Sequence, residues 1–210
     1  MRKLAALVVL GVLVGLYLVA DVVVRGRAES VVASRIEANV PGTTATVHIH
    51  SFPFTGRLAV SGSVPSLRAV VTGVRAGPFA VQSIDLDVEH LVVDRSKLLQ
   101  GDVVPTAIGS ATVTAVVTQA AIDAGIGLPV TLGDGTIGVA GVQVPARVAV
   151  TGGSITIAVA GLRTISLPLL PAALLPCSLT GRVQVGQLLL SCSAAAIPPA
   201  LLHAVAGAAG

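Results

Sequence analysis

The stretch HIHSFPF, residues 48–54, places two histidines one residue apart, beside two of the three phenylalanines of the chain. In a β-strand, His48 and His50 would point to one face, which is the arrangement that the first two ligands of a metal ion need. A closed metal site needs one or two more ligands, and the acids next to His90 alternate onto the face opposite to it. We therefore expect no metal site, and interpret the pair as the partly exposed end of a strand.

The other reactive side chains form no recognisable catalytic constellation. Asp85 and Asp87 share one face of a predicted strand, as hydrolytic carboxylate pairs can, but a solvated strand face explains them without chemistry. Ser154 follows two glycines and is expected in a turn. The sequence has no GxSxG, P-loop or dinucleotide-binding fingerprint. We expect neither an enzyme nor a bound cofactor.

The composition argues against a nucleic-acid partner and for a large apolar interior or contact with a membrane. Apolar residues make up 53% of the 210 residues and charged residues 11%, whereas soluble domains carry roughly a quarter charged residues. The net charge of +3 is not gathered in a basic stripe, and only 2% of the residues are aromatic. Few side chains are therefore available to stack on bases.

The N-terminus carries an uncharged apolar run, from Leu4 to Ala20, behind Arg2 and Lys3. Its length predicts a signal anchor or transmembrane segment over residues 1–21, with a cleaved signal peptide as the alternative. The positive charges precede the apolar run. Both alternatives therefore place the rest of the chain in the cell envelope, on the extracytoplasmic (periplasmic) face of the plasma membrane.

Helix signals continue beyond this run to Val40. Ala28, Val31, Val32 and Ile36 recur at spacings of three to four residues, with charged residues between them. The pattern predicts an amphipathic helix that packs its apolar stripe on the following domain, and a plain juxtamembrane stalk is the alternative.

From Thr43 onward the hydrophobic period changes to two, which predicts strands with one buried face separated by glycine-rich turns. The clearest strands lie around residues 84–88, 110–117, 142–147 and 155–157. One short helix is predicted with Thr118 as its N-cap and Gly125 as its stop. We expect an α+β domain over residues 22–196, built from one long helix and about eight antiparallel strands, and a tail over residues 197–210.

The two cysteines, Cys177 and Cys192, lie on either side of a predicted hairpin with its turn near residues 185–187. An even number of cysteines in an exported chain suggests a disulfide, and two buried free thiols are the alternative.

Several motifs follow one another in an order that resembles a known family. They are Arg27-Ala28-Glu29-Ser30, Ser51-Phe52-Pro53-Phe54-Thr55, Val70-Val71-Thr72-Gly73-Val74, Ile84-Asp85-Leu86-Asp87-Val88, Leu98-Leu99-Gln100-Gly101-Asp102 and Gly109-Ser110-Ala111-Thr112-Val113-Thr114. The chain is similar to the actinobacterial lipomannan elongation factor A family of cell-envelope phospholipid-binding proteins. The resemblance implies a tubular lipid-binding (BPI-like) fold, in which a long N-terminal helix packs in a strongly curved antiparallel sheet. It also implies binding of phosphatidylinositol-type lipids and a role in mannan elongation on envelope lipoglycans.

These expectations assign residues to a lipid site. The acyl cavity would be lined by Phe52, Phe54, Phe79, Leu86, Val88 and Val113. A phosphate headgroup would be held by Arg57, Arg68 and Arg75, and the two histidines could make a pH-tuned contact with it. The alternatives are that the phenylalanines anchor a strand end in the core and that the arginines are solvated.

The expected function is that of a membrane-anchored, extracytoplasmic lipid carrier or presenter, whose partners are a phospholipid, the cytoplasmic membrane and an envelope glycosyltransferase. The alternative is a sealed scaffold that binds no lipid and docks on a membrane glycosyltransferase.

Overall fold

The structure of the protein, a computed structural model, describes residues 2–76, 79–98, 104–139, 142–151, 154–159, 165–168, 177 and 179–195. The expected tail, residues 197–210, lies outside them, as does most of the Leu98–Asp102 motif.

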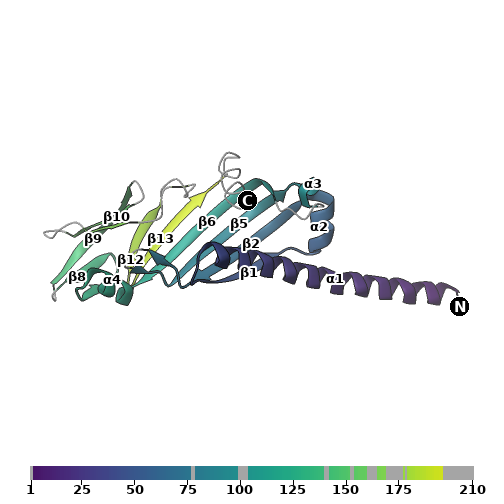
Figure 1. The fold of residues 1–210 in the computed structure, drawn as a ribbon, viewed down its shortest axis with the longest axis horizontal. Coiled ribbons are helices and arrows are strands. Elements are labelled where there is room, and N and C mark those ends of the chain that lie inside the picture. Colours follow the sequence, from purple (N-terminus) through teal and green to yellow (C-terminus); the bar gives the residue numbers. More distant parts are fainter. Residues whose placement is uncertain are drawn as a thin grey trace.

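The first element is a helix of 38 residues, α1 (Arg2–Asn39). At 1.5 Å per residue it is about 57 Å long. Its N-terminal part projects beyond the sheets and its C-terminal part lies along them (Figure 1). The two segments expected on either side of Asp21 thus form one continuous helix. Among the described residues, no helix combines the length and the apolar character that a membrane crossing needs, so the membrane segment expected over residues 1–21 is unsupported.

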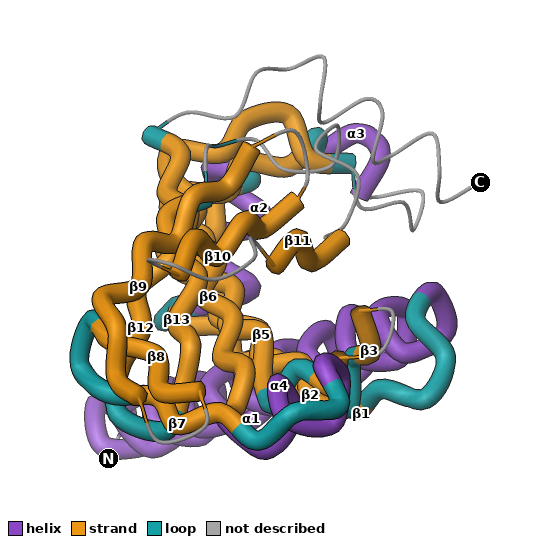
Figure 2. The backbone as a smooth tube through the Cα atoms, turned by 90° about the vertical axis from the view of Figure 1, so that its left-hand side faces the viewer, coloured by secondary structure: helices purple, strands orange, loops and turns teal. Residues whose placement is uncertain are grey.

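A six-stranded antiparallel sheet forms the body of the molecule, in the order β1-β2-β5-β6-β13-β12. Its strands are β1 (Thr44–His50), β2 (Ser63–Thr72), β5 (Ser83–Val93), β6 (Pro105–Thr118), β12 (Thr180–Gln184) and β13 (Gln187–Ala194). Helix α2 (Phe54–Ser61) connects β1 to β2, and α3 (Arg95–Leu98) follows β5. Figure 2 shows the sheet bending, with β1, β2 and β5 beside α1 and with β6, β13 and β12 rising at one side.

A five-stranded sheet, in the order β11-β10-β9-β8-β7, lies at the end of the molecule away from the N-terminus (Figure 1). Its strands are β7 (Val130–Leu132), β8 (Thr136–Val139), β9 (Val142–Thr151), β10 (Ser154–Val159) and β11 (Ile165–Pro168). A two-stranded sheet of β3 (Arg75–Ala76) and β4 (Phe79–Ala80) and the helix α4 (Gln119–Ile126) complete the fold. The long helix and the large antiparallel sheet are as the sequence predicted.

Helix α4 begins where predicted but ends later. The Thr118 side chain accepts a hydrogen bond from the backbone N–H of Ala121 at 3.3 Å and is the N-cap. The helix ends at Gly127, which has a φ of 75°, and not at the predicted Gly125. Gly125 instead lies inside the helix against Phe79, whose ring a Cβ at this position would overlap.

Two clusters of buried apolar residues form the core. The larger cluster joins α4 to the six-stranded and five-stranded sheets at the end away from the N-terminus. It contains Phe79, Val81, Val117, Ile122, Val130, Leu132, Ile137, Val183, Leu188 and Leu190. The smaller contains Ile49, Phe54 and Val64 and lies under α1.

The predicted disulfide is present. Cys177 and Cys192 are bonded, with their Cα atoms 5.7 Å apart. Cys192 is buried on β13, and Cys177 precedes the hairpin of β12 and β13, which turns at residues 185–186 as predicted. Closing a loop of this length contributes about 3 kcal/mol of stability.

At one row of the six-stranded sheet the alternation of inward and outward side chains shifts by one residue, although the pairing of the strands runs on unchanged. Inward positions on β5 are even-numbered up to Val88 and odd-numbered from Leu91 onward, because Glu89 and His90 are both exposed. His90 has a φ of 53°, which is uncommon for a residue other than glycine. Gly109 of β6 leaves room for it, since a Cβ there would lie 2.9 Å from the Cβ of His90.

Candidate functional site

An apolar groove of about 720 Å³ runs between α1 and the inner face of the sheet. Thirteen of its sixteen lining residues are apolar, and the remaining three are Arg27, Arg35 and Asn39. The apolar lining from α1 and the residue after it consists of Val24, Ala28, Val31, Val32, Ile36 and Val40. The body contributes Ile49, Phe54, Leu58, Val64, Leu67, Leu91 and Val93. The volume lies within the range of small-molecule binding pockets.

Two carboxylates hold α1 along the open edge of β1. Glu37 Oε1 accepts a hydrogen bond from the N–H of Ala45 at 2.9 Å, and Glu29 Oε1 accepts one from the N–H of Ile49 at 2.8 Å. Eight residues of helix span about 12 Å and four residues of strand about 13.6 Å, so the two spacings match. This Glu29–Glu37 clamp occupies backbone donors that an edge strand otherwise leaves free, and turns the adjacent stripe of α1 toward the groove.

Asp21 fixes α1 to the start of α2. Its carboxylate is buried and accepts hydrogen bonds from the N–H of Phe54 at 2.9 Å and of Thr55 at 2.6 Å, and from the Thr55 hydroxyl. These are backbone donors that the first turn of a helix leaves without a partner. The hydrogen bond from the Thr55 hydroxyl, with those from the two backbone N–H groups, holds the pKa of Asp21 below its usual value. The contact sets Phe54 and Leu58 into the near end of the groove.

The rim of the groove is basic. Arg27 and Arg35 are exposed side chains of α1, and neither forms an ion pair with an acid among the described residues. The described residues that line the groove include no aspartate or glutamate. Guanidinium groups bind phosphate through paired N–H donors, so this rim suits a phosphate next to an apolar chain.

The expected acyl-site phenylalanines lie in three different environments. Phe54 is buried and lines the groove, whereas Phe52 is 63% exposed, so the two do not share a face. The reason is that α2 begins at Phe54 and rotates it away from the direction of the strand. Phe79 is buried in the larger core cluster, against α4.

Leu86, Val88 and Val113 lie on the inner face of the sheet, one or two rows from the groove. Val88 pairs with Leu67, which does line it, and Leu86 pairs with Val113. None of the three lines the groove itself.

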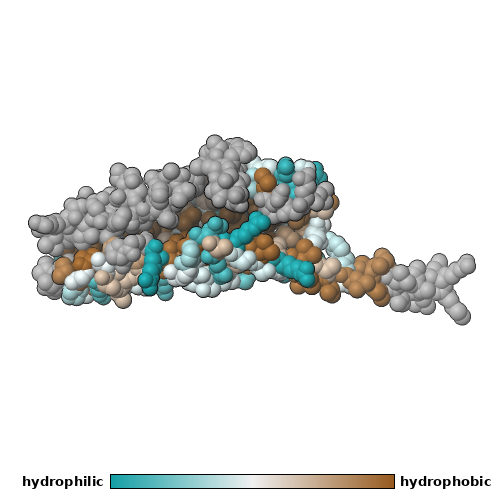
Figure 3. Space-filling model, in the orientation of Figure 1, coloured by the Kyte–Doolittle hydropathy of each residue, from teal (hydrophilic) through white to brown (hydrophobic). Residues whose placement is uncertain are grey.

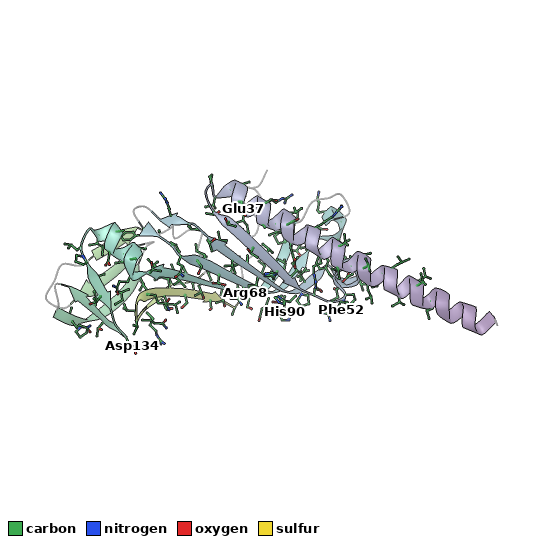
Figure 4. The ribbon with its side chains drawn as sticks, turned by 90° about the horizontal axis from the view of Figure 1, so that it is seen from below. Glu37, Phe52, Arg68, His90 and Asp134 are labelled. Carbon is green, nitrogen blue, oxygen red and sulfur yellow. A yellow bond between two sulfur atoms is a disulfide. The ribbon has the colours of Figure 1, made fainter. Side chains whose placement is uncertain are left out.

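The expected headgroup arginines are not at this groove. Arg68 lies on the outer face, where it donates to Asp85 at 2.9 Å and lies 3.8 Å from Asp87. The hydrogen bond to Asp85 and the charge of Asp87 raise the pKa of Arg68. Figure 4 shows Arg68, His90 and Phe52 on the side of the molecule away from Glu37 of α1. Arg57 is exposed on α2, and Arg75 is exposed on β3.

The HIHSFPF stretch is divided between the two faces. His48 and His50 are exposed on the outer face of β1, while Ile49 between them is buried and lines the groove. Among the described residues, no group of three or more histidine, cysteine, aspartate or glutamate side chains is placed to hold a metal ion.

The groove, its clamped helix and its basic rim are features of a site for an amphiphilic anion. Residues 19–209, nearly the whole chain, match one family, described as LmeA-like phospholipid-binding. The chain belongs to this family. The family resemblance that the sequence motifs indicated is thereby confirmed. No curated protein matches the chain, and no solved structure does so either.

The sequence did not assign Arg27 and Arg35 to the site, nor the five groove leucines and valines that follow Phe54. Both arginines lie among the regularly spaced apolar residues of the stretch 24–40. This spacing is the feature of the sequence that could have predicted a basic rim beside an apolar groove. The helix α2 was missed as well, although Pro53 before its start and Gly62 after its end, with a φ of 64°, are usual boundaries of a helix.

Proposed function

We propose that the protein holds a phospholipid with an acyl chain in the groove beside α1 and the phosphate at Arg27 and Arg35. The observation that carries this proposal is the apolar groove with a rim of unpaired cations in a chain of the phospholipid-binding family. The proposal needs no covalent step and assigns no catalytic residue.

Hydrophobic transfer is sufficient to drive the binding. Each buried methylene contributes about 0.8 kcal/mol, so a chain with about twelve buried methylenes would gain about 10 kcal/mol before the cost of ordering. The groove follows α1 from Val24 to Val40, which is about 24 Å of helix. This length accommodates one extended acyl chain.

We infer that the lipid is of the phosphatidylinositol type and that the protein acts outside the cytoplasm, at the membrane, in lipid transfer or in lipoglycan mannan elongation with an envelope glycosyltransferase. The disulfide supports an oxidising compartment. The positive residues Arg2 and Lys3, which precede the apolar run, support export of the remainder.

The test is native mass spectrometry of the full chain released from detergent micelles after incubation with phosphatidylinositol. We expect one bound phospholipid per chain. Val31 lines the groove and is 50% exposed, so Val31→Trp fills the groove without entering the core and should abolish the bound mass. Ser34→Trp is the matched control, since Ser34 is exposed on α1 outside the groove lining.

A chain that stays free of lipid would refute the proposal and favour the scaffold that docks on a glycosyltransferase. Equal loss of lipid in both tryptophan variants would refute the placement in this groove. Replacing Arg27 and Arg35 with glutamine should weaken binding of phosphatidylinositol more than binding of phosphatidylcholine, because only the first lipid has a net negative headgroup.

A further inference from the structure

We propose that the end of the molecule formed by α2 and α3 docks on an anionic bilayer surface, which sets the near end of the groove against the lipid source. This docking end consists of Phe52, Arg57, Val60, Arg95 and Lys97. The inference deepens the proposed function and rests on it, because it names the surface from which the groove is filled.

Helix α2 presents one face to the groove and another to solvent. Phe54 and Leu58, four residues apart, line the groove. Arg57 and Val60, three residues apart, lie on the outward face, where Val60 is 77% exposed. Phe52, just before the helix, is 63% exposed. Two large apolar side chains thus project next to a cation, which is the pattern of a segment that lies in a membrane interface.

Helix α3 adds two cations to the same surface. Arg95 donates to the carbonyl of Val60 at 2.8 Å, which holds α3 against the end of α2. Lys97 is exposed beside it. The acid nearby, Asp94, accepts hydrogen bonds from the Ser96 hydroxyl and from the backbone N–H groups of Ser96 and Lys97, and these lower its pKa. Asp94 therefore stays ionised, and the three cations Arg57, Arg95 and Lys97 outnumber this one carboxylate, so the balance of charge on the surface is positive.

The projecting part of α1 leaves the molecule at this same end (Figure 1). Its large apolar residues from Leu10 to Val19 are exposed on all sides of the helix, which is brown in Figure 3 where it leaves the body. One protein face can cover only one side of a helix, whereas lipid surrounds it. The charge of α2 and α3 and the apolar helix therefore specify the same partner, a bilayer with anionic headgroups.

The groove begins at this surface. Its first lining residue on α1, Val24, is one helical turn beyond Asp21, the residue that joins α1 to α2. A lipid leaving the docked bilayer would therefore meet the groove between α1 and α2 before any other apolar surface of the sheet.

Tryptophan scanning of the full chain tests the docking, because the sequence contains no tryptophan. Phe52→Trp and Val60→Trp each place a probe at the docking end, where an exposed side chain is replaced. Val185→Trp is the matched control, since Val185 is 78% exposed in the turn between β12 and β13, at the opposite end of the molecule. The probe vesicles contain phosphatidylglycerol and brominated phosphatidylcholine.

We expect the bromine atoms to quench Phe52→Trp and Val60→Trp strongly and Val185→Trp weakly. Each replacement of Arg57, Arg95 or Lys97 by glutamine should weaken vesicle binding about fivefold at low salt. Equal quenching of all three probes, or quenching of neither probe at the docking end while the protein floats with the vesicles, overturns the inference. Quenching in a chain that carries no lipid in the mass spectrum would keep the docking and refute the proposed groove function.

Discussion

The Glu29–Glu37 clamp predicts a localised effect on backbone protection. In Glu29→Ala, the N–H of Ile49 loses its acceptor, and in Glu37→Ala the N–H of Ala45 does. A hydrogen bond to a charged group contributes about 1.5 to 3 kcal/mol. The Glu29 side chain is 24% exposed, so we expect the lower end of this range, which corresponds to exchange about tenfold faster at Ile49.

Hydrogen exchange resolved by residue measures this directly. Glu29→Ala should accelerate exchange of the Ile49 N–H and leave the Ala45 N–H protected. Glu37→Ala should accelerate exchange of the Ala45 N–H and leave the Ile49 N–H protected. Thr46 and His48 alternate with these residues along β1, so their N–H groups point to β2 and serve as internal controls.

Two matched variants separate the clamp from other effects. Glu29→Gln keeps an oxygen acceptor and should accelerate Ile49 less than the alanine variant does. Arg25→Ala removes the 4.0 Å ion pair with Glu29 and should leave Ile49 protected. If Glu29→Ala accelerated hydrogen exchange equally at Ala45 and Ile49, or at neither, then α1 would not be held by two independent hydrogen bonds. That result would refute the Glu29–Glu37 clamp.

Further variants probe the Asp21 contact, one glycine each of α1 and α4, and the N-cap of α4. The pKa of the Asp21 carboxylate is lowered in the fold. The carboxylate therefore stabilises the α1–α2 contact at pH values above its ordinary pKa of 3.8, and this stabilisation is lost as the pH falls below that value. The fluorescence of Tyr17, the one tyrosine, should report an acid transition that Asp21→Asn lacks. Gly125→Ala should lower the free energy of unfolding in urea by about 1 to 2 kcal/mol, because overlap with a buried ring outweighs the gain in helix propensity. Gly26→Ala should raise the free energy of unfolding by about 0.5 to 1 kcal/mol, because no atom lies within 4 Å of the added Cβ. If Gly125→Ala stabilised the protein and Gly26→Ala destabilised it, the surroundings assigned to both glycines would be wrong. Thr118→Ala should cost about 1 kcal/mol in the same assay and Thr118→Ser little, whereas equal losses would exclude capping.

Local periodicity was sufficient to predict the long helix, the short helix after Thr118 and the strands around residues 84–88, 110–117, 142–147 and 155–157, because each depends on residues close in sequence. The expected number of about eight strands was too low, since the described residues form thirteen. Asp21 was interpreted as the end of an apolar segment, since a charge usually marks such an end. Its actual partners are the N–H groups of residues 54 and 55, more than thirty positions away, and no local pattern reports them.

The assignment of faces failed for a different reason. Strand alternation was extended through Phe52 and Phe54, but a short helix begins at Phe54 and separates their directions. Arg68 was expected to hold a phosphate headgroup. The alternation on β2 from Leu67 onward instead places it on the outer face, opposite Asp87. The alternation itself was thus informative, and the missed helix was the error.

The shift of inward positions at His90 limits which insertions and deletions the sheet can accept. Inward positions change from even to odd on β5, and the neighbouring strands change likewise, between Val64 and Leu67 on β2 and between Ile108 and Ala111 on β6. A single deletion in one strand would turn its half of the groove wall inside out, while the other two strands kept their orientation. The three strands therefore keep a common inner face only if they gain or lose residues together at this row.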